Sequence, residues 1–379
     1  MSGTDFAAVT PKLGFGLMRL PKLSDGTTDI EQTKEMVDLF LDAGFTYFDT
    51  AYVYDNGGSE EAARKALVDR YPREKYTIAT KMNAWLGKPD EESVKKQIDV
   101  SLERLGTGYI DYYLLHALQL NTRKFYERYR LWDHIRELKA KGKIKHWGFS
   151  FHATPEMLDE LLTENPDAEF VQLQINYADW ENTNIASRAC HEVARKHGKQ
   201  IVVMEPVKGG MLANPPQEIV DLFRQEAPEK SCASWALRFA AHQEGIITVL
   251  SGMSDVAQMK DNIASMKGFS KLSGRELEVI GRAQEIIAKS GAIPCTGCHY
   301  CTGGCPAHIN IPDVFRAINT MRIYNDLEQA KRRYGFATMG RNAKAETCIA
   351  CGQCEGACPQ RLNIIELLKE GAELFDRAS

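Results

Sequence analysis

Eight of the ten cysteines in this 379-residue chain lie in two matched runs near its C-terminus, "CTGCHYCTGGCP" and "CIACGQCEGACP". Both runs have the spacing C-x2-C-x2-C-x3-C-P. The eight thiols, four from each run, are Cys295, Cys298, Cys301, Cys305, Cys348, Cys351, Cys354 and Cys358. Thiolates are soft ligands that select iron–sulfur clusters and zinc. The spacing therefore predicts metal chemistry.

Disulfides are the alternative explanation for clustered cysteines. The chain begins "MSGTDFAAVTPKLGFG", which lacks the basic and apolar regions of a secretion signal, so we expect a cytoplasmic protein. Because the cytoplasm keeps thiols reduced, the two runs indicate metal ligands rather than disulfides. The two isolated cysteines, Cys190 and Cys232, are expected to be small buried residues.

The spacing is typical of bacterial [4Fe–4S] ferredoxins, in which the fourth cysteine of one run binds the cluster of the other run. On that pattern the two ligand sets are Cys295, Cys298, Cys301 with Cys358, and Cys348, Cys351, Cys354 with Cys305. Structural zinc is the alternative, but it needs only four ligands, usually from two separated pairs. Eight cysteines in two identical runs exceed that need, so two [4Fe–4S] clusters are predicted.

The spacer between the runs contains "IPDVFRAINTMRIYNDLEQAKRRYG", and "RLNIIELLKEGAELF" follows the second run. Both stretches have helical patterns, and the region resembles the α-helical ferredoxin domains of succinate dehydrogenase and heterodisulfide reductase subunits. Within the spacer, Lys331, Arg332 and Arg333 form a basic triplet that either docks an acidic electron carrier, such as a ferredoxin, or is a solvated helix face.

Eight short apolar runs precede the cysteine region, and helical sequence follows each of them. These candidate strands cover residues 13–18, 45–49, 76–81, 109–116, 144–150, 170–176, 200–206 and 245–252. Runs that are apolar nearly throughout are typical of parallel strands buried on both faces. The alternation predicts an α/β fold, a (β/α)8 TIM barrel. A doubly wound fold is not favoured, because "GFGLMR" lacks the third glycine of GxGxxG.

In such a barrel the chemistry lies at the C-terminal ends of the strands. Asp49, Lys81 and His116 stand at three of these ends, and Tyr54 lies in the loop after Asp49. A nearby lysine cation lowers the pKa of a tyrosine, which is otherwise about 10, and an aspartate holds that lysine in place. A histidine can orient the substrate oxygen. Singly, each residue fits a rim salt bridge or a cap, whereas the four together suit carbonyl reduction.

The motifs "FDTAYVYDNGGSEE", "TK" at 80–81 and "YYLLH" at 112–116 resemble the aldo-keto reductase superfamily, and the resemblance extends over roughly residues 10–285. It implies a (β/α)8 barrel that uses NAD(P)H and acts on a small carbonyl or alcohol. It also implies that Tyr54 is the general acid in reduction and the base in oxidation, that Asp49 and Lys81 tune it, and that His116 orients the carbonyl.

The same resemblance implies a set of contacts to the cofactor. The positions are Ser150, Gln172, Met204, Gly252, Ser254, Gln258 and Asn262. The chain departs from the family in two places, with Phe151 in place of an asparagine and Met204 where an aromatic residue often stacks on the nicotinamide. Gly252 and Gln258 replace the Lys and Arg that bind a 2′-phosphate in shorter members. Lys208 and Lys260 are candidate substitutes, so both NADPH and NADH remain open.

Two further residues near the predicted strand ends have alternative roles. Arg19, in "GFGLMRLP", either binds a substrate carboxylate through two hydrogen bonds or forms an ion pair at the barrel rim. Trp85, four residues after Lys81, either belongs to the substrate loop or only packs there.

The overall composition limits the partners. The formal net charge is −4, which gives no overall electrostatic reason to bind nucleic acid or an anionic membrane. No apolar run approaches the ~20 residues of a membrane span. We therefore expect two domains, an aldo-keto reductase barrel at 1–288 and a mainly helical, ferredoxin-like domain with two clusters at 289–379.

Two functions follow from these features. The first is an NAD(P)H-dependent oxidoreductase that reduces an aldehyde or ketone and carries two [4Fe–4S] clusters. The second is a ferredoxin-linked electron-transfer protein that uses the barrel as an active or docking site. A nicotinamide delivers two electrons together and a cluster accepts one, so the second function calls for an adapter such as flavin. The sequence contains no separate flavin motif, and a flavin in the barrel mouth stays open.

Overall fold

The computed structural model describes residues 12–86, 89–182, 185–324, 326–340 and 342–377. The chain divides into two compact units. The barrel unit comprises Met1–Pro206 and Ala233–Leu272, and the cysteine unit comprises Val207–Cys232 and Ser273–Ser379. Within the described residues, no helix has the length and apolar character that a membrane span requires.

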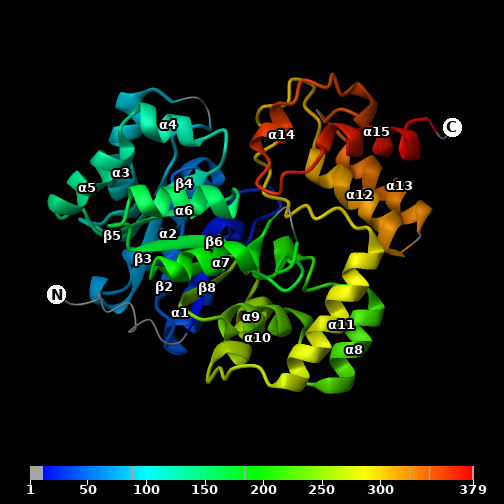
Figure 1. The fold of residues 1–379 in the computed structure, drawn as a ribbon, viewed down its shortest axis with the longest axis horizontal. Coiled ribbons are helices and arrows are strands. Elements are labelled where there is room, and N and C mark those ends of the chain that lie inside the picture. Colours follow the sequence, from blue (N-terminus) through cyan, green and yellow to red (C-terminus); the bar gives the residue numbers. More distant parts are fainter. Residues whose placement is uncertain (1–11, 87–88, 183–184, 325, 341, 378–379) are drawn as a thin grey trace. The chain divides into compact units, whose positions relative to one another are not determined.

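The barrel unit is built on a parallel sheet (Figure 1). The sheet is closed, because β1 pairs with β8 and each other strand pairs with its neighbours in sequence. The strands are β1 (Leu13–Gly16), β2 (Tyr47–Asp49), β3 (Thr77–Met82), β4 (Ile110–Leu118), β5 (Ile144–Phe151), β6 (Phe170–Gln174), β7 (Gln200–Met204) and β8 (Ile246–Ser251). The predicted TIM barrel is confirmed, and each predicted strand is present with its ends shifted by a few residues.

Helices follow the strands and surround the sheet (Figure 1). In this unit they are α1 (Ile30–Asp42), α2 (Gly58–Ala63), α3 (Glu91–Leu105), α4 (Arg123–Arg128), α5 (Leu131–Ala140), α6 (Pro155–Glu164), α7 (Ser187–Lys196), α9 (Cys232–His242) and α10 (Val256–Met266). Local sequence sets their ends. Thr154 caps α6, with Pro155 in the first turn, and Gly106 ends α3 in the left-handed conformation.

Side chains fill the inside of the barrel. A buried cluster from several strands contains Tyr47, Ala79, Tyr112, Leu114, Phe170, Val202, Ile247 and Leu250. Because these residues occupy the space between the strands, the barrel has a packed core rather than a pore. Chemistry is therefore confined to the end of the barrel at which the strands stop.

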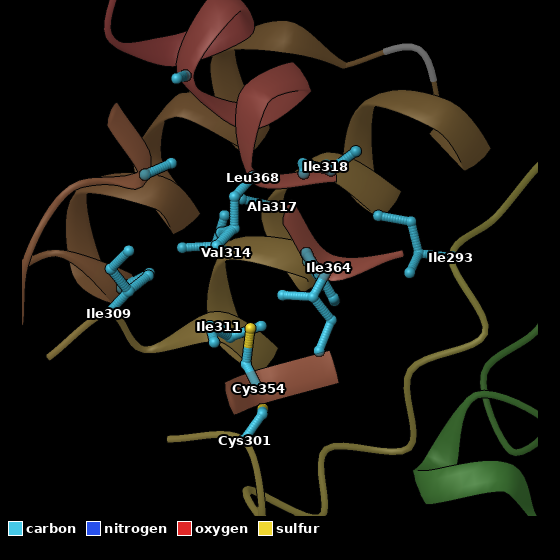
Figure 2. Packing of buried hydrophobic residues seen from close by; sticks show 14 of the residues in the cluster. Ile293, Cys301, Ile309, Ile311, Val314, Ala317, Ile318, Cys354, Ile364 and Leu368 are labelled. Carbon is cyan, nitrogen blue, oxygen red and sulfur yellow. The ribbon is translucent and has the colours of Figure 1, made fainter. Parts of the chain in front are cut away.

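The cysteine unit is mainly helical. Its helices are α8 (Gln217–Glu226), α11 (Gly274–Ser290), α12 (Ile311–Tyr324), α13 (Leu327–Ala337), α14 (Gln353–Ala357) and α15 (Ile364–Phe375). Buried Val314, Ile318 and Leu368 form its core together with Cys301 and Cys354 (Figure 2). The cysteines are thus part of the hydrophobic core of this unit.

Shorter helical turns complete the chain. They are η2 (Leu17–Arg19), η3 (Tyr54–Gly57), η4 (Arg64–Val68), η5 (Arg73–Lys75), η6 (Lys208–Gly210) and η7 (Ala345–Thr347). Of these, η3 carries Tyr54, and η6 is the first helical turn after β7.

The segment 207–232 lies between β7 and α9 in sequence but belongs to the cysteine unit. Its helix α8 lies beside α11 (Figure 1), and Arg275 forms a 2.7 Å ion pair with Glu226. Gly209 has φ +63° and lies so close to Thr296 that a Cβ would stand 2.1 Å from the Thr296 carbonyl oxygen. The compact units therefore divide the chain at other positions than the predicted domain boundary at 288. That boundary stays a prediction.

Candidate active site and cluster region

The structure brings the four predicted catalytic residues together at the C-terminal ends of β2, β3 and β4. Asp49 ends β2, Lys81 lies near the end of β3, and His116 lies near the end of β4. Lys81 Nζ donates a 2.5 Å hydrogen bond to Asp49 Oδ1 and lies 4.9 Å from the centre of the Tyr54 ring. The Tyr54 and His116 ring centres are 5.6 Å apart, in an edge-on arrangement. The four side chains thus form one continuous cluster.

Backbone hydrogen bonds fix the loop that carries Tyr54. The Thr50 N–H donates to the Ala79 carbonyl at 2.8 Å, and the Tyr52 N–H donates to the Lys81 carbonyl at 3.2 Å. Lys81 Nζ also donates to the Thr50 carbonyl at 2.7 Å. The loop therefore continues the pairing of β2 with β3 beyond the strand end, and this places Tyr54 over Lys81.

Burial and pairing compete at the ion pair. Asp49 and Lys81 are 3% and 0% exposed. Burial raises the pKa of Asp49 and lowers the pKa of Lys81, while their mutual attraction opposes both shifts. The close contact holds the lysine cation beneath the Tyr54 ring, where a positive charge favours the phenolate form of a tyrosine.

His116 is buried and neutral at neutral pH. Burial, together with the charges of Lys81 and His152, lowers the pKa of His116 well below its usual value. A neutral imidazole can donate an N–H to a carbonyl oxygen without carrying a charge. The next residue, Ala117, has φ +55°, and its N–H donates to Ser150 Oγ at 2.7 Å. The turn after His116 is therefore held by a side chain of the neighbouring strand.

Two of the predicted cofactor contacts are part of this same network. Ser150, in β5, accepts the Ala117 hydrogen bond, and Gln172, in β6, donates to Asp49 Oδ2 at 3.3 Å. Met204 is the last residue of β7 and is half-buried. All three belong to the strand ends that the sequence predicts, and their contacts with a cofactor stay a prediction.

The other predicted cofactor contacts lie around the start of α10. Ser254 Oγ donates to the Arg19 carbonyl at 2.9 Å, and the Ser254 N–H donates to Gln258 Oε1 at 2.9 Å. Asn262 Nδ2 donates to Ser251 Oγ at 2.7 Å. Gly252 is exposed, and the side chain of Arg19 lies beside it.

The structure also places the residues with alternative predicted roles. Arg19 lies 3.7 Å from Glu205, so the predicted ion pair is present at the rim. Trp85 Nε1 donates to the His116 carbonyl at 3.4 Å, so this indole packs against the backbone of a predicted catalytic residue. Lys208 is buried in η6 and Lys260 is exposed on α10.

A pocket in the cysteine unit is lined by the thiols of Cys305, Cys348, Cys351 and Cys354. Its empty volume is about 310 Å³, part of which is open solvent. Apolar side chains, among them Ile311 and Leu368, line the remainder. The four thiols are the set that the crossed pattern predicts for one cluster.

The thiols of Cys295, Cys298 and Cys358 lie close enough to Cys301 to affect its pKa. Burial raises the pKa of Cys301, and the neighbouring thiols of Cys298, Cys295 and Cys358 raise it further. This grouping again takes one cysteine from the opposite run. A buried apolar site disfavours free thiolates, and iron bound to them compensates for that cost, so the residues fit iron–sulfur clusters.

Among the described residues, no three Cys, His, Asp or Glu side chains converge closely enough to share a single metal ion. Which cysteines bind iron stays a prediction.

The sequence analysis missed two residues next to the tetrad. Glu60, in α2, is fully buried and accepts a 2.7 Å hydrogen bond from Thr80 Oγ1, and Arg104 Nη1 donates to its other oxygen at 3.1 Å. No local sequence signal marks Glu60, because its partner comes from α3, forty-four residues later.

Comparisons with known proteins give consistent results. A family model described as "Aldo/keto reductase family" matches residues 12–284, and one described as "4Fe-4S dicluster domain" matches residues 294–363. An uncharacterized oxidoreductase, YqkF of Bacillus subtilis, is 23% identical over 71% of this chain and 91% of its own length. An NADH-specific methylglyoxal reductase of Escherichia coli is 24% identical over 61% of this chain and 82% of its own length.

The fold also matches solved structures. An aldo-keto reductase from Klebsiella pneumoniae in complex with NADPH aligns with a TM-score of 0.58 at 22% identity. The alignment covers 72% of this chain and 90% of that protein. At this identity the likeness supports the barrel fold of the first part of the chain.

Proposed function

Since this chain belongs to the aldo/keto reductase family and is an oxidoreductase with a C-terminal 4Fe-4S domain, we propose that it uses NAD(P)H to reduce the carbonyl group of a small aldehyde or ketone. The observation that carries the proposal is the buried Asp49–Lys81 pair, which lies under the Tyr54 ring and next to His116. These four groups supply what carbonyl reduction needs from a protein.

The proposed steps use these residues as follows. When bound, a nicotinamide would supply the hydride for the carbonyl carbon. The Tyr54 hydroxyl donates its proton to the carbonyl oxygen, and the product is an alcohol. The Lys81 cation stabilises the phenolate left on Tyr54, and Asp49 keeps Lys81 in place. Neutral His116 donates an N–H to the carbonyl oxygen and so orients the substrate. Oxidation of an alcohol reverses each step, with Tyr54 as the base.

The nicotinamide site is proposed from the strand ends and from the relatives. Ser150, Gln172 and Met204 would lie on the nicotinamide side, and Gly252, Ser254, Gln258 and Asn262 on the adenosine side. The Klebsiella pneumoniae structure contains NADPH, and the Escherichia coli relative is NADH-specific, so both cofactors remain candidates. The name of that relative supports a small carbonyl compound as the substrate class.

For the cysteine unit we propose two [4Fe–4S] clusters with crossed ligation, carried by a helical ferredoxin-like domain at 289–379. The pocket lined by Cys305, Cys348, Cys351 and Cys354 supports one ligand set. The neighbouring thiols of Cys295, Cys298, Cys301 and Cys358 support the other. We also propose that the protein is cytoplasmic, and that it binds neither nucleic acid nor membrane.

A second candidate function is one-electron exchange with a carrier such as a ferredoxin. Cys351 and its neighbour Ile349 are exposed, although both line the pocket of the proposed second cluster. A cluster with an exposed edge is accessible to an electron carrier. This function needs an adapter such as flavin between a two-electron donor and a one-electron acceptor.

One experiment tests both candidates. Anaerobically purified protein would receive NADPH, and then NADH, with and without methylglyoxal as a carbonyl probe, while visible absorbance and EPR follow the clusters. Consumption of NAD(P)H that requires the probe, with clusters that only dithionite reduces, supports the carbonyl reductase. Reduction of the clusters by NAD(P)H alone, with stoichiometric bound flavin, supports electron transfer instead.

A further inference from the structure

Glu60 is a buried charge at the edge of the proposed active site. It is 0% exposed, and its two carboxylate oxygens have different partners. Oε1 accepts a 2.7 Å hydrogen bond from Thr80, and Oε2 faces Arg104 at 3.1 Å. A carboxylate is costly to bury unless it is paired and hydrogen-bonded, so both partners are needed to keep Glu60 in place.

Arg104 connects Glu60 to the loop that carries Tyr54. Its Nη1 donates to the Tyr52 carbonyl at 3.1 Å, and its guanidinium lies 4.6 Å from the centre of the Tyr52 ring. At the other end of the loop, a Cβ on Gly57 would stand 2.5 Å from Arg104 Cζ. Gly57 has φ +95°, a conformation that suits glycine, and it leaves room for the guanidinium. Arg104 therefore contacts the chain on both sides of Tyr54.

The other oxygen of Glu60 connects the pair to Lys81. Thr80 precedes Lys81 in β3, and its hydroxyl is bound to Glu60 inside the protein. Burial is the largest influence on the pKa of Lys81 and lowers it. The charges of Asp49 and Glu60 act in the opposite direction and favour the lysine cation. Glu60 thus supports Lys81 both by contact and by charge.

We propose that Glu60 and Arg104 form a positioning pair that holds the Tyr54 loop against the strand carrying Lys81. This role rests on the proposed carbonyl reduction, because the pair would set the distance between Tyr54, the proton donor, and the Lys81 cation that lowers the pKa of a tyrosine. Neither residue belongs to the proposed catalytic tetrad. Their effect is on geometry, and a displacement of about 1 Å at a reacting group can reduce the rate 10²-fold.

The alternative is that the pair contributes only stability, as other partly buried ion pairs do. Arg70 provides a matched comparison, because it also joins a carboxylate, Asp38 at 2.8 Å, to a backbone carbonyl, that of Ala66 at 2.9 Å. Its side chain is 29% exposed, against 23% for Arg104. Arg70 contacts α1 and η4 rather than the Tyr54 loop, so its loss removes a similar pair away from the site.

The first test compares Arg104→Met with Arg70→Met in the full-length holoenzyme. We expect Arg104→Met to lower kcat for methylglyoxal reduction about 10²-fold while the KM for NADPH changes less than about twofold, since the lost effect acts on the chemical step. We expect Arg70→Met to leave kcat near wild type. Equal losses of kcat in the two variants would overturn the proposal.

A second variant covers the case in which Arg104→Met does not fold. Arg104→Lys keeps the cation beside Glu60 but loses the planar group that spans the Tyr52 carbonyl and ring. We expect a folded protein that still has a clearly reduced kcat. A wild-type kcat in Arg104→Lys would show that a positive charge at this position is enough for full activity. The proposal that the guanidinium positions the loop would then be wrong.

Amide hydrogen exchange gives a readout that does not depend on activity. In Arg104→Lys the amides of residues 52–58 should exchange faster than in wild type, and in Arg70→Met they should not. Unchanged exchange in this loop would contradict the proposal even if kcat fell. If wild-type protein turns over no carbonyl probe, the proposed function fails, and the exchange data still decide whether the pair holds the loop.

A matched carboxylate comparison tests the Glu60 side of the pair. Glu169 is also largely buried, and it binds Lys139, His146 and the Trp147 N–H. It precedes β6, at the end of the barrel opposite the site. We expect Glu60→Gln to lower kcat at least tenfold more than Glu169→Gln, and similar values would count against the pair.

Discussion

In the proposed mechanism, Lys81 and Asp49 make Tyr54 a stronger acid. A free tyrosine, with a pKa of about 10, is a weak acid at neutral pH. The Lys81 cation, 4.9 Å from the ring centre, favours the phenolate, and Asp49 keeps that cation in a buried position. Loss of the Tyr54 hydroxyl removes the proposed proton donor itself, whereas loss of Lys81 or Asp49 only makes that donor a weaker acid. Substitution of Tyr54 is therefore the most direct test of the mechanism.

The first prediction concerns Tyr54→Phe. Loss of the proton donor should lower kcat for methylglyoxal reduction by about 10²–10⁴-fold, the usual contribution of general acid catalysis. Binding of NADPH, measured by fluorescence titration, should persist. Tyr71→Phe is the control, because it likewise removes one tyrosine hydroxyl, which here donates to Asp38 in a different part of the barrel unit. A fully active Tyr54→Phe would remove Tyr54 from the mechanism.

The second prediction concerns His116 and pH. The folded protein holds the pKa of His116 well below the roughly 6.5 of the unfolded chain. The resulting stability is complete above about pH 6.5 and is lost as the pH falls toward the lowered pKa, because in that window only the unfolded chain binds the proton. Urea unfolding between pH 7 and 5 should show this loss, at most about 1.4 kcal/mol per pH unit.

The comparison for this prediction is His116→Gln, which removes the titrating group. Its free energy of unfolding should fall less steeply between pH 7 and 5 than that of the wild-type protein. Identical slopes would mean that other groups, such as the partly buried His134 and His191, cause the pH dependence.

At the scale of elements, the strands could be predicted from the sequence. The side-chain contacts that connect different strands and helices could not. Each strand has a local signal, an apolar run followed by a helix, and Asp49, Lys81 and His116 follow directly from where the runs stop. The Glu60–Arg104 pair has no such signal, because its residues lie forty-four positions apart and meet only after α2 and α3 have packed. Ser150 is predicted to contact the cofactor, and this stays a prediction; the hydrogen bond that its hydroxyl accepts from the Ala117 N–H had no signal in the sequence.

The crossed pattern of the cysteine runs gives the third prediction. Wild-type protein should contain about eight iron atoms per chain, and loss of one cluster should leave about four. Cys305→Ser combined with Cys351→Ser affects one proposed cluster, so this double variant should retain about four iron atoms. Cys305→Ser combined with Cys298→Ser affects both clusters, so little iron should remain. Iron and acid-labile sulfide analysis would measure both.

Uncrossed ligation, in which each run binds its own cluster, predicts the reverse order of iron contents for these two double variants. The comparison therefore does not depend on how well serine replaces a thiolate, because both proteins contain the same number of substitutions.

At the scale of the whole molecule, the two units should respond differently to loss of iron. Cys301, Cys354 and Cys358 are part of the hydrophobic core of the cysteine unit, so iron binding and packing stabilise the same residues. The barrel core contains none of the eight run cysteines. The fourth prediction is that anaerobic chelation of oxidised protein raises hydrogen exchange in α12–α15 while β1–β8 remain protected.

Exchange followed by mass spectrometry would test this prediction, with the intact holoenzyme as the control. Equal loss of protection in β1–β8 would mean that the iron stabilises the barrel strands as well, and that the two units unfold together.

The placement of α8 has a consequence for biosynthesis. Ile219, Leu222 and Phe223 of this helix are buried, and α11, which lies beside it, comes later in the chain, after β8. A ribosome therefore releases α8 and then the last strand of the barrel before α11 exists to cover that apolar side. For this interval the nascent chain exposes a patch that attracts chaperones. A gene shortened at residue 272 would make that exposure permanent.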